Sequence, residues 1–478
     1  MKRTISVLLA ASLMATWLSA CGSGGGSANS TDNGGSGQAT ESGGAPEGSP
    51  PGNSPGDFPG GNPPDGVPGG QSGGTDIVYT AAVEIPSTDS QDGQTYASST
   101  ADENALLISA PAEVSVSNPT VTKSGDSDGG DKCNFYGLNA AVLVKDGANV
   151  TISGGSVTSD ASGANGVFCY GGNGGQNGAS GDGTALEIRD TAITTSGDGS
   201  GGIMTTGGGV TSAQNLTIVT SGRSSAPIRT DRGGGTVTVE GGSYTSNGLG
   251  SPAIYSTADI TVSNAALTSN LSEGVCIEGK NSITLNNCDL TANNTERNGN
   301  AKFLDSIMIY QSMSGDADSG TSVFAMTGGS LTSKSGHVFH VTNTNAVITL
   351  ESVTLTNEDE SGVLLSVCAD GWSGAENVAT LNATNQTLQG AVLVGDDSAL
   401  TLNLSNGSNF TGCVHGAIEN AEGVTVSTDV GVVSVTLDSS SSWTLTADSY
   451  VTEFQGESAN VIRNGHTLYI NGVAFPEA

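Results

Sequence analysis

Residues 260–290 read ITVSNAALTSNLSEGVCIEGKNSITLNNCDL and contain one eight-residue pattern twice. The pattern is hydrophobic, x, hydrophobic, x, turn residue, x, x, hydrophobic, and its turn position holds Asn264 and then Asn287. The closing hydrophobic residues, Leu267 and Leu290, lie 23 residues apart. A repeat of about this length predicts a solenoid, in which each unit stacks on the next.

The same pattern recurs along most of the chain. Further copies occupy 114–121, 150–157, 186–193, 237–244, 324–331 and 348–355, and a degenerate copy ends at Ile218. The turn position holds Gly, Asn, Asp or Ser, which favour turns, and Gly and Asn enter left-handed backbone conformations at small steric cost. The flanking aliphatic residues alternate with Thr and Ser, a pattern typical of strands with one buried face.

A third strand is expected before each pair, for example at 253–255, 276–278 and 307–310. Three short strands per coil, with coils about 4.8 Å apart, predict an all-β fold, a parallel β-helix with coils of about 23 residues. Parallel crossovers are right-handed in nearly all cases, so we expect a right-handed helix. Open ends invite aggregation, so we also expect a cap at each end.

The pattern resembles that of the pectin-lyase-like β-helix superfamily over roughly residues 100–425. The stretch 226–235, APIRTDRGGG, also resembles stretches in β-helix, adhesin-like lipoproteins of gut-type bacteria. The superfamily resemblance implies a sugar-binding cleft along the outer face of the strand that follows the longest loops.

The N-terminal 75 residues indicate export rather than folding. Residues 1–20 combine a basic start with an apolar run and predict a secretory signal. The sequence LSAC at 18–21 resembles the bacterial lipoprotein cleavage box, which implies lipidation of Cys21, with a plain secretory signal as the alternative. Residues 21–75 are rich in Gly, Ser and Pro and predict a disordered tether, because they cannot bury enough apolar surface to fold.

The expected location is therefore extracytoplasmic, at the cell surface, with the membrane contacted only through the lipid anchor. We expect an N-terminal cap at 76–110, the parallel β-helix at 111–425 and C-terminal strands with a cap at 426–478. These parts are expected to form one long domain and a monomer.

The formal net charge of −33 bounds the possible partners. A surface this acidic repels nucleic acid and anionic lipid headgroups, so a nucleic-acid partner is not expected. The charge suits neutral sugars or cations. Six cysteines remain besides Cys21; they are expected to be isolated buried thiols, or Cys133 and Cys169 bridge two loops in an oxidising exterior.

Chemically diverse side chains are expected on the outer face of the strand that precedes each pair. Aligning the inward aliphatic residues of these strands places the residue that follows each one in an outward row. This row contains Lys145, Phe168, Met204, Arg229, Tyr255, Glu278, Tyr310 and His340. A second outward row, two residues further on, contains Asp231 and Lys280. Long insertions at 133–139, 171–183 and 295–305 are expected to flank a groove over these rows.

Such a groove suits a polysaccharide or a host or cell-surface glycan, because rings stack on sugar faces and charged groups bond to hydroxyls. The predicted ligand-binding residues are Arg229, Tyr255, Glu278, Tyr310 and His340. The main prediction is non-catalytic glycan binding or adhesion. A solvated face without a ligand and a protein-binding surface are alternatives, as is a passive cell-wall spacer.

A catalytic alternative rests on Arg229, Asp231, Glu278 and Lys280. A calcium-assisted polysaccharide lyase that acts on uronate-containing glycans needs a base at the sugar and a cation that neutralises the uronate. A hydrolase would need converging carboxylates, for which Asp231 and Glu278 are the candidates.

Calcium is the one cofactor that the sequence suggests. Asp126, Asp128 and Asp131 lie close together in one loop and could hold it through oxygens, or they could be solvated. His337 and His340 are three residues apart in an expected strand, so we expect them on opposite faces, where they cannot share an ion.

Overall fold

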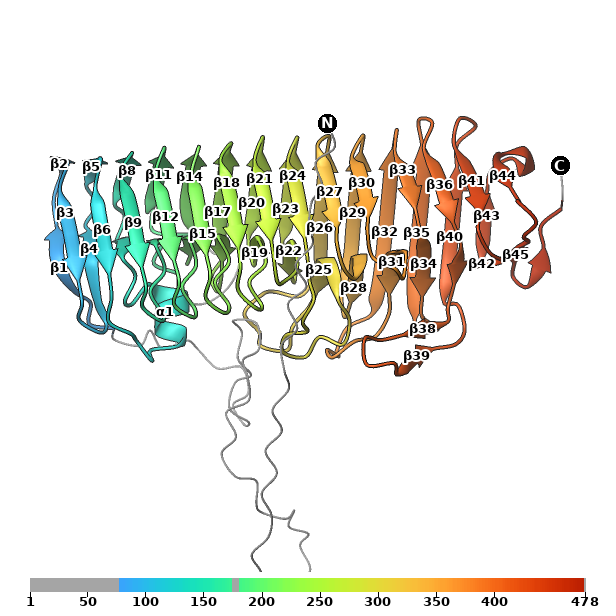
Figure 1. Ribbon diagram of the computed structural model, residues 1–478, viewed down its shortest axis with the longest axis horizontal. Coiled ribbons are helices and arrows are strands. Elements are labelled where there is room, and N and C mark those ends of the chain that lie inside the picture. The colour runs from blue at the N-terminus through green and yellow to red at the C-terminus, as the bar shows by residue number, and fades with distance from the viewer. Residues whose placement is uncertain (1–76, 174–179, 477–478) are drawn as a thin grey trace, which may run out of the picture. The chain divides into compact units, whose positions relative to one another are not determined.

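The computed structural model describes residues 77–173 and 180–476. The predicted signal at 1–20, the predicted lipidation site Cys21 and the predicted tether at 21–75 lie outside these residues. The described chain is a parallel β-helix, in which three parallel sheets are built from strands that recur in threes (Figure 1). The predicted fold class is confirmed.

The first sheet has 13 strands among the described residues. They are β1 (Thr80–Ile85), β4 (Glu103–Ser109), β7 (Val142–Lys145), β10 (Val167–Tyr170), β13 (Ile203–Thr206), β16 (Ile228–Thr230), β19 (Ile254–Ser256), β22 (Val275–Glu278), β25 (Asp305–Tyr310), β28 (His337–Thr342), β31 (Val363–Val367), β34 (Ala391–Val394) and β37 (Val414–His415).

The second sheet has 14 strands in the described part of the chain. They are β2 (Asp89–Asp92), β5 (Glu113–Ser117), β8 (Asn149–Ser153), β11 (Ala185–Arg189), β14 (Gly209–Gln214), β17 (Gly235–Glu240), β20 (Asp259–Ser263), β23 (Ser282–Asn286), β26 (Thr321–Thr327), β29 (Asn345–Glu351), β32 (Asn377–Thr384), β35 (Ser398–Ser405), β40 (Val432–Leu437) and β43 (Glu453–Gln455).

The third sheet has ten described strands, and a separate four-stranded sheet continues the same side of the coil. The ten are β3 (Thr95–Ser98), β6 (Thr120–Lys123), β9 (Ser156–Ser159), β12 (Ala192–Thr195), β15 (Thr217–Thr220), β18 (Ser243–Ser246), β21 (Ala266–Ser269), β24 (Asp289–Ala292), β27 (Ser330–Ser333) and β30 (Thr354–Asn357). The four are β33 (Thr387–Gln389), β36 (Asn409–Gly412), β41 (Ser442–Leu445) and β44 (Val461–Ile462).

Two small sheets and two short helical elements of the described chain accompany the three main sheets. A two-stranded antiparallel sheet pairs β38 (Ile418–Glu419) with β39 (Thr425–Ser427). Near the C-terminus, a three-stranded sheet joins β42 (Ser449–Val451), β45 (Leu468–Ile470) and β46 (Val473–Ala474). The helical elements are α1 (Asp131–Tyr136) and the 3₁₀ turn η1 (Ser458–Asn460). In the described part of the chain, no helix is long and apolar enough to span a membrane.

The repeat pattern predicted the register of the third sheet correctly. Its closing hydrophobic residues pair coil after coil, from Val121 with Val157 to Leu331 with Leu355. These side chains lie in one continuous apolar core with inward residues of the other sheets, such as Val150 and Ile228. The alternation of aliphatic residues with Thr and Ser therefore divides core from surface, as expected of half-buried strands.

Each predicted turn residue has a positive φ. The values include 57° at Asn264, 50° at Asn287 and 56° at Ser352. From β5 to β33, the strand of the second sheet and the next strand of the third sheet are separated by two residues in each coil. This corner is the constant part of the repeat, and the insertions lie at the two corners that flank the first sheet.

The stacked strands extend beyond both ends of the segment predicted as the β-helix, and strands had also been predicted after residue 425. Residues expected in an N-terminal cap at 76–110 include β1, β2 and β3, which pair in parallel with the strands of the next coil. The first coil therefore begins at Thr80, since this stretch has strand chemistry although its repeat pattern is degenerate. Coiling also continues beyond 425, because β40 and β43 extend the second sheet.

The described cysteines are free and buried: Cys133, Cys169, Cys276, Cys288, Cys368 and Cys413. A bridge between Cys133 and Cys169 is therefore absent. Burial raises the pKa of the Cys169 thiol to about 12, which keeps it protonated at neutral pH.

We expect Asn264→Ala to lower the free energy of unfolding by about 1–2 kcal/mol, because a Cβ disfavours the left-handed conformation that this corner requires. Asn264→Gly keeps the conformation available and should be close to the parent. Denaturant unfolding followed by circular dichroism measures both. Equal loss in the two variants would show that the Asn264 side chain, rather than its backbone conformation, stabilises the corner.

Candidate functional site

The six residues placed on the predicted groove face lie on the first sheet but are covered. Their exposed fractions are 0% for Asp231 and His340 and 1% for Arg229, Tyr255, Glu278 and Tyr310. Contacts to them come from side chains of α1 and of the segments 294–304, 311–320 and 368–376, and also from the Ser224 carbonyl and the Ser366 side chain. The expected open groove is therefore absent there, because the insertions pack onto the face instead of flanking it. Ligand binding by the five residues predicted for it, all of these except Asp231, remains a prediction, as does the catalytic role considered for Asp231.

The alignment of the predicted outward row is wrong by two residues in some strands. Tyr255 pairs with Cys276, whereas Glu278 pairs with Tyr310. Val142, and not Val144, pairs with Val167, so Lys145 does not belong to the row of Phe168. A shift of two residues keeps every side chain on its own face of a strand, so the alternating pattern alone cannot detect it.

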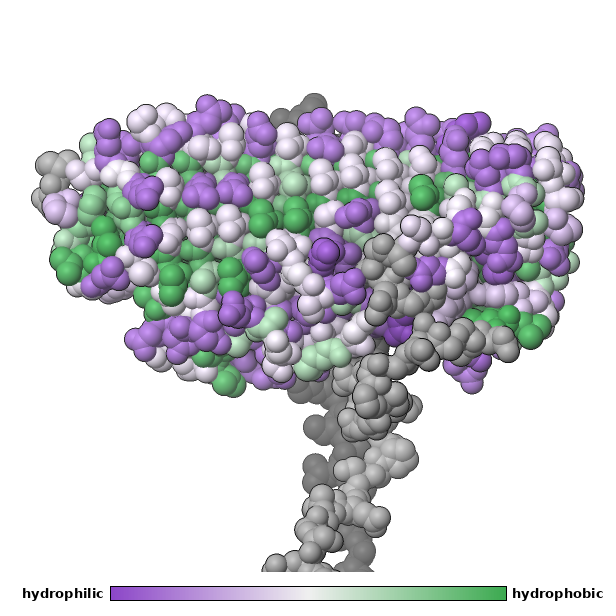
Figure 2. Space-filling model, turned by 180° about the vertical axis from the view of Figure 1, so that it is seen from behind, coloured by the Kyte–Doolittle hydropathy of each residue, from purple (hydrophilic) through white to green (hydrophobic). Residues whose placement is uncertain are grey.

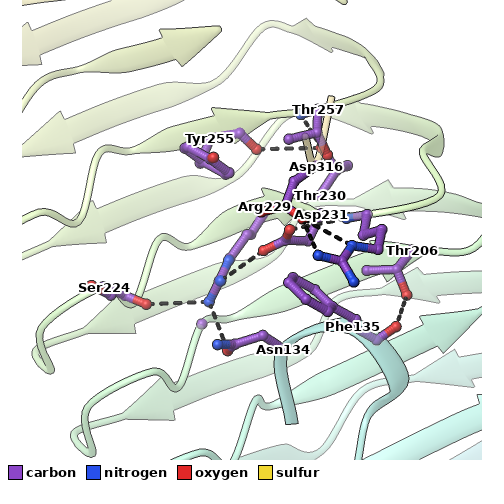
Figure 3. Close-up of polar contacts among 12 residues, drawn as sticks. Asn134, Phe135, Thr206, Ser224, Arg229, Thr230, Asp231, Tyr255, Thr257 and Asp316 are labelled. Carbon is purple, nitrogen blue, oxygen red and sulfur yellow. Dashed lines mark hydrogen bonds and ion pairs between the residues drawn. The ribbon is translucent and has the colours of Figure 1, made fainter. Parts of the chain in front are cut away.

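Arg229 and Asp231 project from the same side of β16 and form a buried ion pair. Arg229 Nη2 lies 2.9 Å from Asp231 Oδ2. Arg229 Nη1 also donates to the Ser224 carbonyl at 3.2 Å and to Asn134 Oδ1 at 3.4 Å, so the guanidinium links β16 to α1 (Figure 3). Removing either partner would leave the other one buried without its hydrogen bond, so this contact resists rearrangement.

Arg232 makes a second link between the sheet and the loops. Its Nε donates to Asp316 Oδ1 at 2.8 Å, and its guanidinium lies 4.3 Å from the centre of the Phe135 ring. Asp316 belongs to the 311–320 segment, and Phe135 belongs to α1. The two arginines thus hold two loops against the first sheet.

Burial raises the pKa of Asp231 to about 8, and the Arg229 guanidinium opposes that rise. The folded state therefore binds a proton at Asp231 more readily than the unfolded chain, whose aspartate pKa is about 3.9. A carboxyl with a raised pKa contributes stability at low pH and loses it as pH rises towards the folded pKa. The sensitive window runs from about pH 4 to about pH 8.

Glu278 is enclosed by hydroxyl groups. Its carboxylate accepts hydrogen bonds from Tyr255, from Tyr310 at 3.1 Å, from Ser312 and from Ser314 at 3.4 Å. Burial raises the pKa of Glu278, and these hydroxyl donors oppose the rise. Both carboxylate oxygens of Glu278 therefore accept hydrogen bonds from within the protein.

His340 belongs to a buried polar group with Ser366 and Asp370. Its Nδ1 lies 2.7 Å from Ser366 Oγ, and its Nε2 lies 3.2 Å from Asp370 Oδ2. Phe303 covers the imidazole with ring centres 4.6 Å apart. The serine is fully buried, so this set resembles a catalytic triad only in its bonding.

His337 also contacts Ser366 Oγ, at 2.7 Å through its Nδ1. The expectation that His337 and His340 point to opposite faces is therefore wrong. His337 is the first residue of β28, where the strand alternation has not yet begun. Burial lowers the pKa of His337 to about 3, so it stays neutral at ordinary pH.

Lys280 is the one catalytic candidate on the surface. It lines a cleft of about 470 Å³ at the corner between the first and second sheets. The charged lining side chains are Asp259, Lys280 and Asp318, all exposed. Glycines 208, 233, 234 and 235 form much of the remaining lining, so backbone rather than bulky side chains faces the cleft.

The cleft lies over the corners that follow β13, β16, β19 and β22, and it is also lined by Ser180 and Gly181 after β10 and by Asp318 after β25. With coils about 4.8 Å apart, the four central corners span about 14 Å along the helix axis. The sequence singled out Lys280 and the glycine run at 233–235 but missed Asp259 and Asp318. Asp318 lies in an insertion that contains Gly315 and Gly320, which is a weak turn signal, whereas no glycine stands near Asp259 in the sequence and nothing there marked it.

The described residues contain no cluster of side chains that could bind calcium. Among the residues that the structure describes, no group of three or more His, Cys, Asp or Glu side chains is placed to hold a metal ion. Asp126 Oδ1 instead accepts a hydrogen bond from the Ser162 amide at 2.8 Å. This contact ties the acidic loop to the next coil.

Comparison of the chain with models of known protein families, with curated proteins and with solved structures found no match. The class defined here is therefore structural, a parallel β-helix with loop-covered charges and an open polar cleft.

We expect Asp231→Asn to remove one pH-dependent contribution to stability. The unfolding free energy of the parent minus that of the variant should fall between pH 5 and pH 8, because the parent loses the stability that its raised Asp231 pKa contributes at low pH. Denaturant midpoints across this range measure the effect. A difference that grows with pH would show instead that the ionised pair with Arg229 is the more stable form.

Proposed function

We propose that the protein is a surface-anchored β-helix that binds polysaccharide without catalysis. In this proposal Cys21 carries the lipid anchor, and residues 21–75 hold the β-helix away from the membrane. The likeness of its repeat pattern to the pectin-lyase-like superfamily and to β-helix surface lipoproteins supports the proposal.

The observation that carries the proposal is the polar cleft at Lys280. It is open, runs along the helix axis and holds two carboxylates and an amine close to a floor of glycine backbone. Carboxylates accept hydrogen bonds from sugar hydroxyls, and an ammonium group donates to them. A glycine floor lets a sugar ring approach the backbone closely, so an extended glycan chain fits both the chemistry and the direction.

Charge favours a neutral glycan over a uronate polymer. The chain carries a formal net charge of −33, so a polyanion meets long-range repulsion on approach. Figure 2 shows hydrophilic residues along the upper edge of one side of the β-helix. Hydroxyl recognition by Asp259 and Asp318 does not require a charged ligand.

Catalysis is disfavoured by the state of the carboxylates on the first sheet. Asp231 is paired with Arg229, and Glu278 accepts four hydroxyl contacts, so both are engaged and covered. An inverting glycosidase needs two carboxyl groups about 6.5–9.5 Å apart on either side of an accessible bond. Neither group reaches solvent in this structure.

The double variant Lys280→Ala, Asp259→Ala should weaken retention on the cognate neutral polysaccharide by about tenfold or more, since charged hydrogen bonds contribute about 1.5–3 kcal/mol each. A glycan array identifies the polysaccharide, and affinity electrophoresis measures the loss. The control is Lys334→Ala, Asp289→Ala on the third sheet. Asp259 accepts from Ser282 at 2.6 Å, and Asp289 accepts from Ser330 at 2.7 Å, so the two aspartates are matched.

Equal retention by both double variants would remove the cleft as the binding site. A parent protein that binds no glycan on the array would favour the passive wall spacer.

A calcium-assisted lyase is the second candidate, because an exposed lysine amine lies in the same cleft as two aspartates. We expect no rise in the ultraviolet absorbance of an unsaturated product when the protein is mixed with uronate-containing glycans and calcium. A rise that disappears in Lys280→Ala would identify Lys280 as the base and overturn the non-catalytic proposal.

A further inference from the structure

The described chain enters the β-helix through a strand at a sheet edge. Among the described strands, β1 lies at the end of the first sheet and pairs with β4 on one side. Of its six residues, Ile85 is the buried one, and it is the last. Edge segments that bury little apolar surface open at low cost in free energy. The start of β1 is therefore a weak point of the first coil, which consists of β1, β2 and β3.

Tension in a tether would arrive at this weak point. In the proposed function, residues 21–75 hold the β-helix away from the membrane. A pull between the membrane and a bound ligand then reaches the described chain at Ile77 and passes to β1 three residues later. When a strand is pulled from its end, its ladder hydrogen bonds break one after another, so each bond resists the pull alone.

Tyr79, the residue before β1, reaches the third coil, which consists of β7, β8 and β9. Its hydroxyl donates to the Tyr136 carbonyl at 2.9 Å, and the Lys145 ammonium lies 4.7 Å from the centre of its ring. Tyr136 is the last residue of α1, which leads into β7, and Lys145 is the last residue of β7. These two contacts therefore pass over β4, the neighbour of β1 in the sheet.

The groups that hold Tyr79 are fixed by further coils. The Tyr136 ring meets the Tyr170 ring of β10 edge to face, with ring centres 5.6 Å apart. The Phe135 carbonyl accepts from Thr206 Oγ1 of β13 at 2.7 Å. A pull that reaches Tyr79 is thus shared among the coils of β7, β10 and β13.

Tyr79 keeps both contacts at ordinary pH. Burial raises the pKa of its phenol above the usual value of about 10, and the nearby Tyr170, Asp146 and Tyr136 raise it further. The phenol therefore stays protonated and donates its hydrogen bond. The face of its ring is electron-rich and attracts the Lys145 ammonium.

We propose that Tyr79 is a clasp that joins the end of the tether to the third coil, so that tension in the tether does not peel β1 from the sheet. The inference rests on the proposed function, because it requires residues 21–75 to be a tether. The contacts of the clasp break before the ladder between β1 and β4 carries the pull. The clasp therefore slows the opening of the first coil when the chain is pulled from its N-terminal side.

The test pulls on single molecules of residues 21–478, produced without lipid. One handle is attached to Cys21 and the other at the exposed position of Lys334→Cys, since the six described cysteines are buried. At constant force, Tyr79→Ala should raise the rate of the first opening step by about tenfold, because it removes a hydrogen bond and a cation–π contact. Tyr79→Phe removes only the hydrogen bond and should give a smaller increase.

Two controls separate the clasp from general destabilisation. Val78→Ala changes the neighbouring residue, which is 80% exposed, and should leave the opening rate unchanged. Handles at Lys334→Cys and at the C-terminus load the coils after β27, so Tyr79→Ala should then have no effect on the rate. Circular dichroism checks that all variants fold.

Three outcomes would overturn the clasp. They are an unchanged opening rate in Tyr79→Ala, an equal increase in Val78→Ala, and an equal effect of Tyr79→Ala in the two pulling geometries. The proposed function fails by a different measurement. Mass spectrometry that finds no lipid on Cys21 in protein purified from the producing cells would remove the tether, whatever the pulling experiment shows.

Discussion

The fold depends on one backbone constraint, the two-residue corner between the second and third sheets. Coils stacked about 4.8 Å apart leave little room there. A Cβ added at Gly155 would lie 2.1 Å from the Pro119 carbonyl oxygen, and one added at Gly329 would lie 2.1 Å from that of Cys288. The preceding residue has a positive φ in the same coils, as at Gly154 and Gly328. Because the corner has the same length in every coil from β5 to β33, it keeps the two sheets in phase over that part of the column.

This constraint decides where extra chain can be placed. From β5 to β33 this corner contains no insertion, so the extra residues of those coils lie at the corners on either side of the first sheet, where α1 and the 311–320 segment fold onto its outer face. The polar residues beneath them must then find partners inside the protein. Arg229 pairs with Asp231, and Arg232 pairs with Asp316. Glu278 accepts hydrogen bonds from hydroxyl groups. The diversity of the outward row thus follows from the loops that cover it.

The contrast between one corner of constant length and two corners of variable length also explains which features the sequence could predict. The eight-residue pattern spans the fixed corner, so it determined both the turn residues and the pairing of Leu267 with Leu290. The first sheet follows corners of variable length, and a shift of two residues leaves its alternation intact, so Glu278 was placed beside Tyr255 when it pairs with Tyr310. The burial of His340 depends on the path of the loop that carries Phe303. No repeat encodes that path, so the sequence pattern could not reveal it.

Two open places on the coil differ in which part of the chain faces solvent. At Lys280, glycine corners recede and leave charged side chains facing solvent, which suits a partner whose specificity lies in its hydroxyl groups. At β30, no backbone ladder joins this strand to β33, and peptide amides and carbonyls beside the core line the cleft between the two strands. Gln386 already satisfies one peptide group of that edge with its own amide, which lowers the cost of keeping the sheet open.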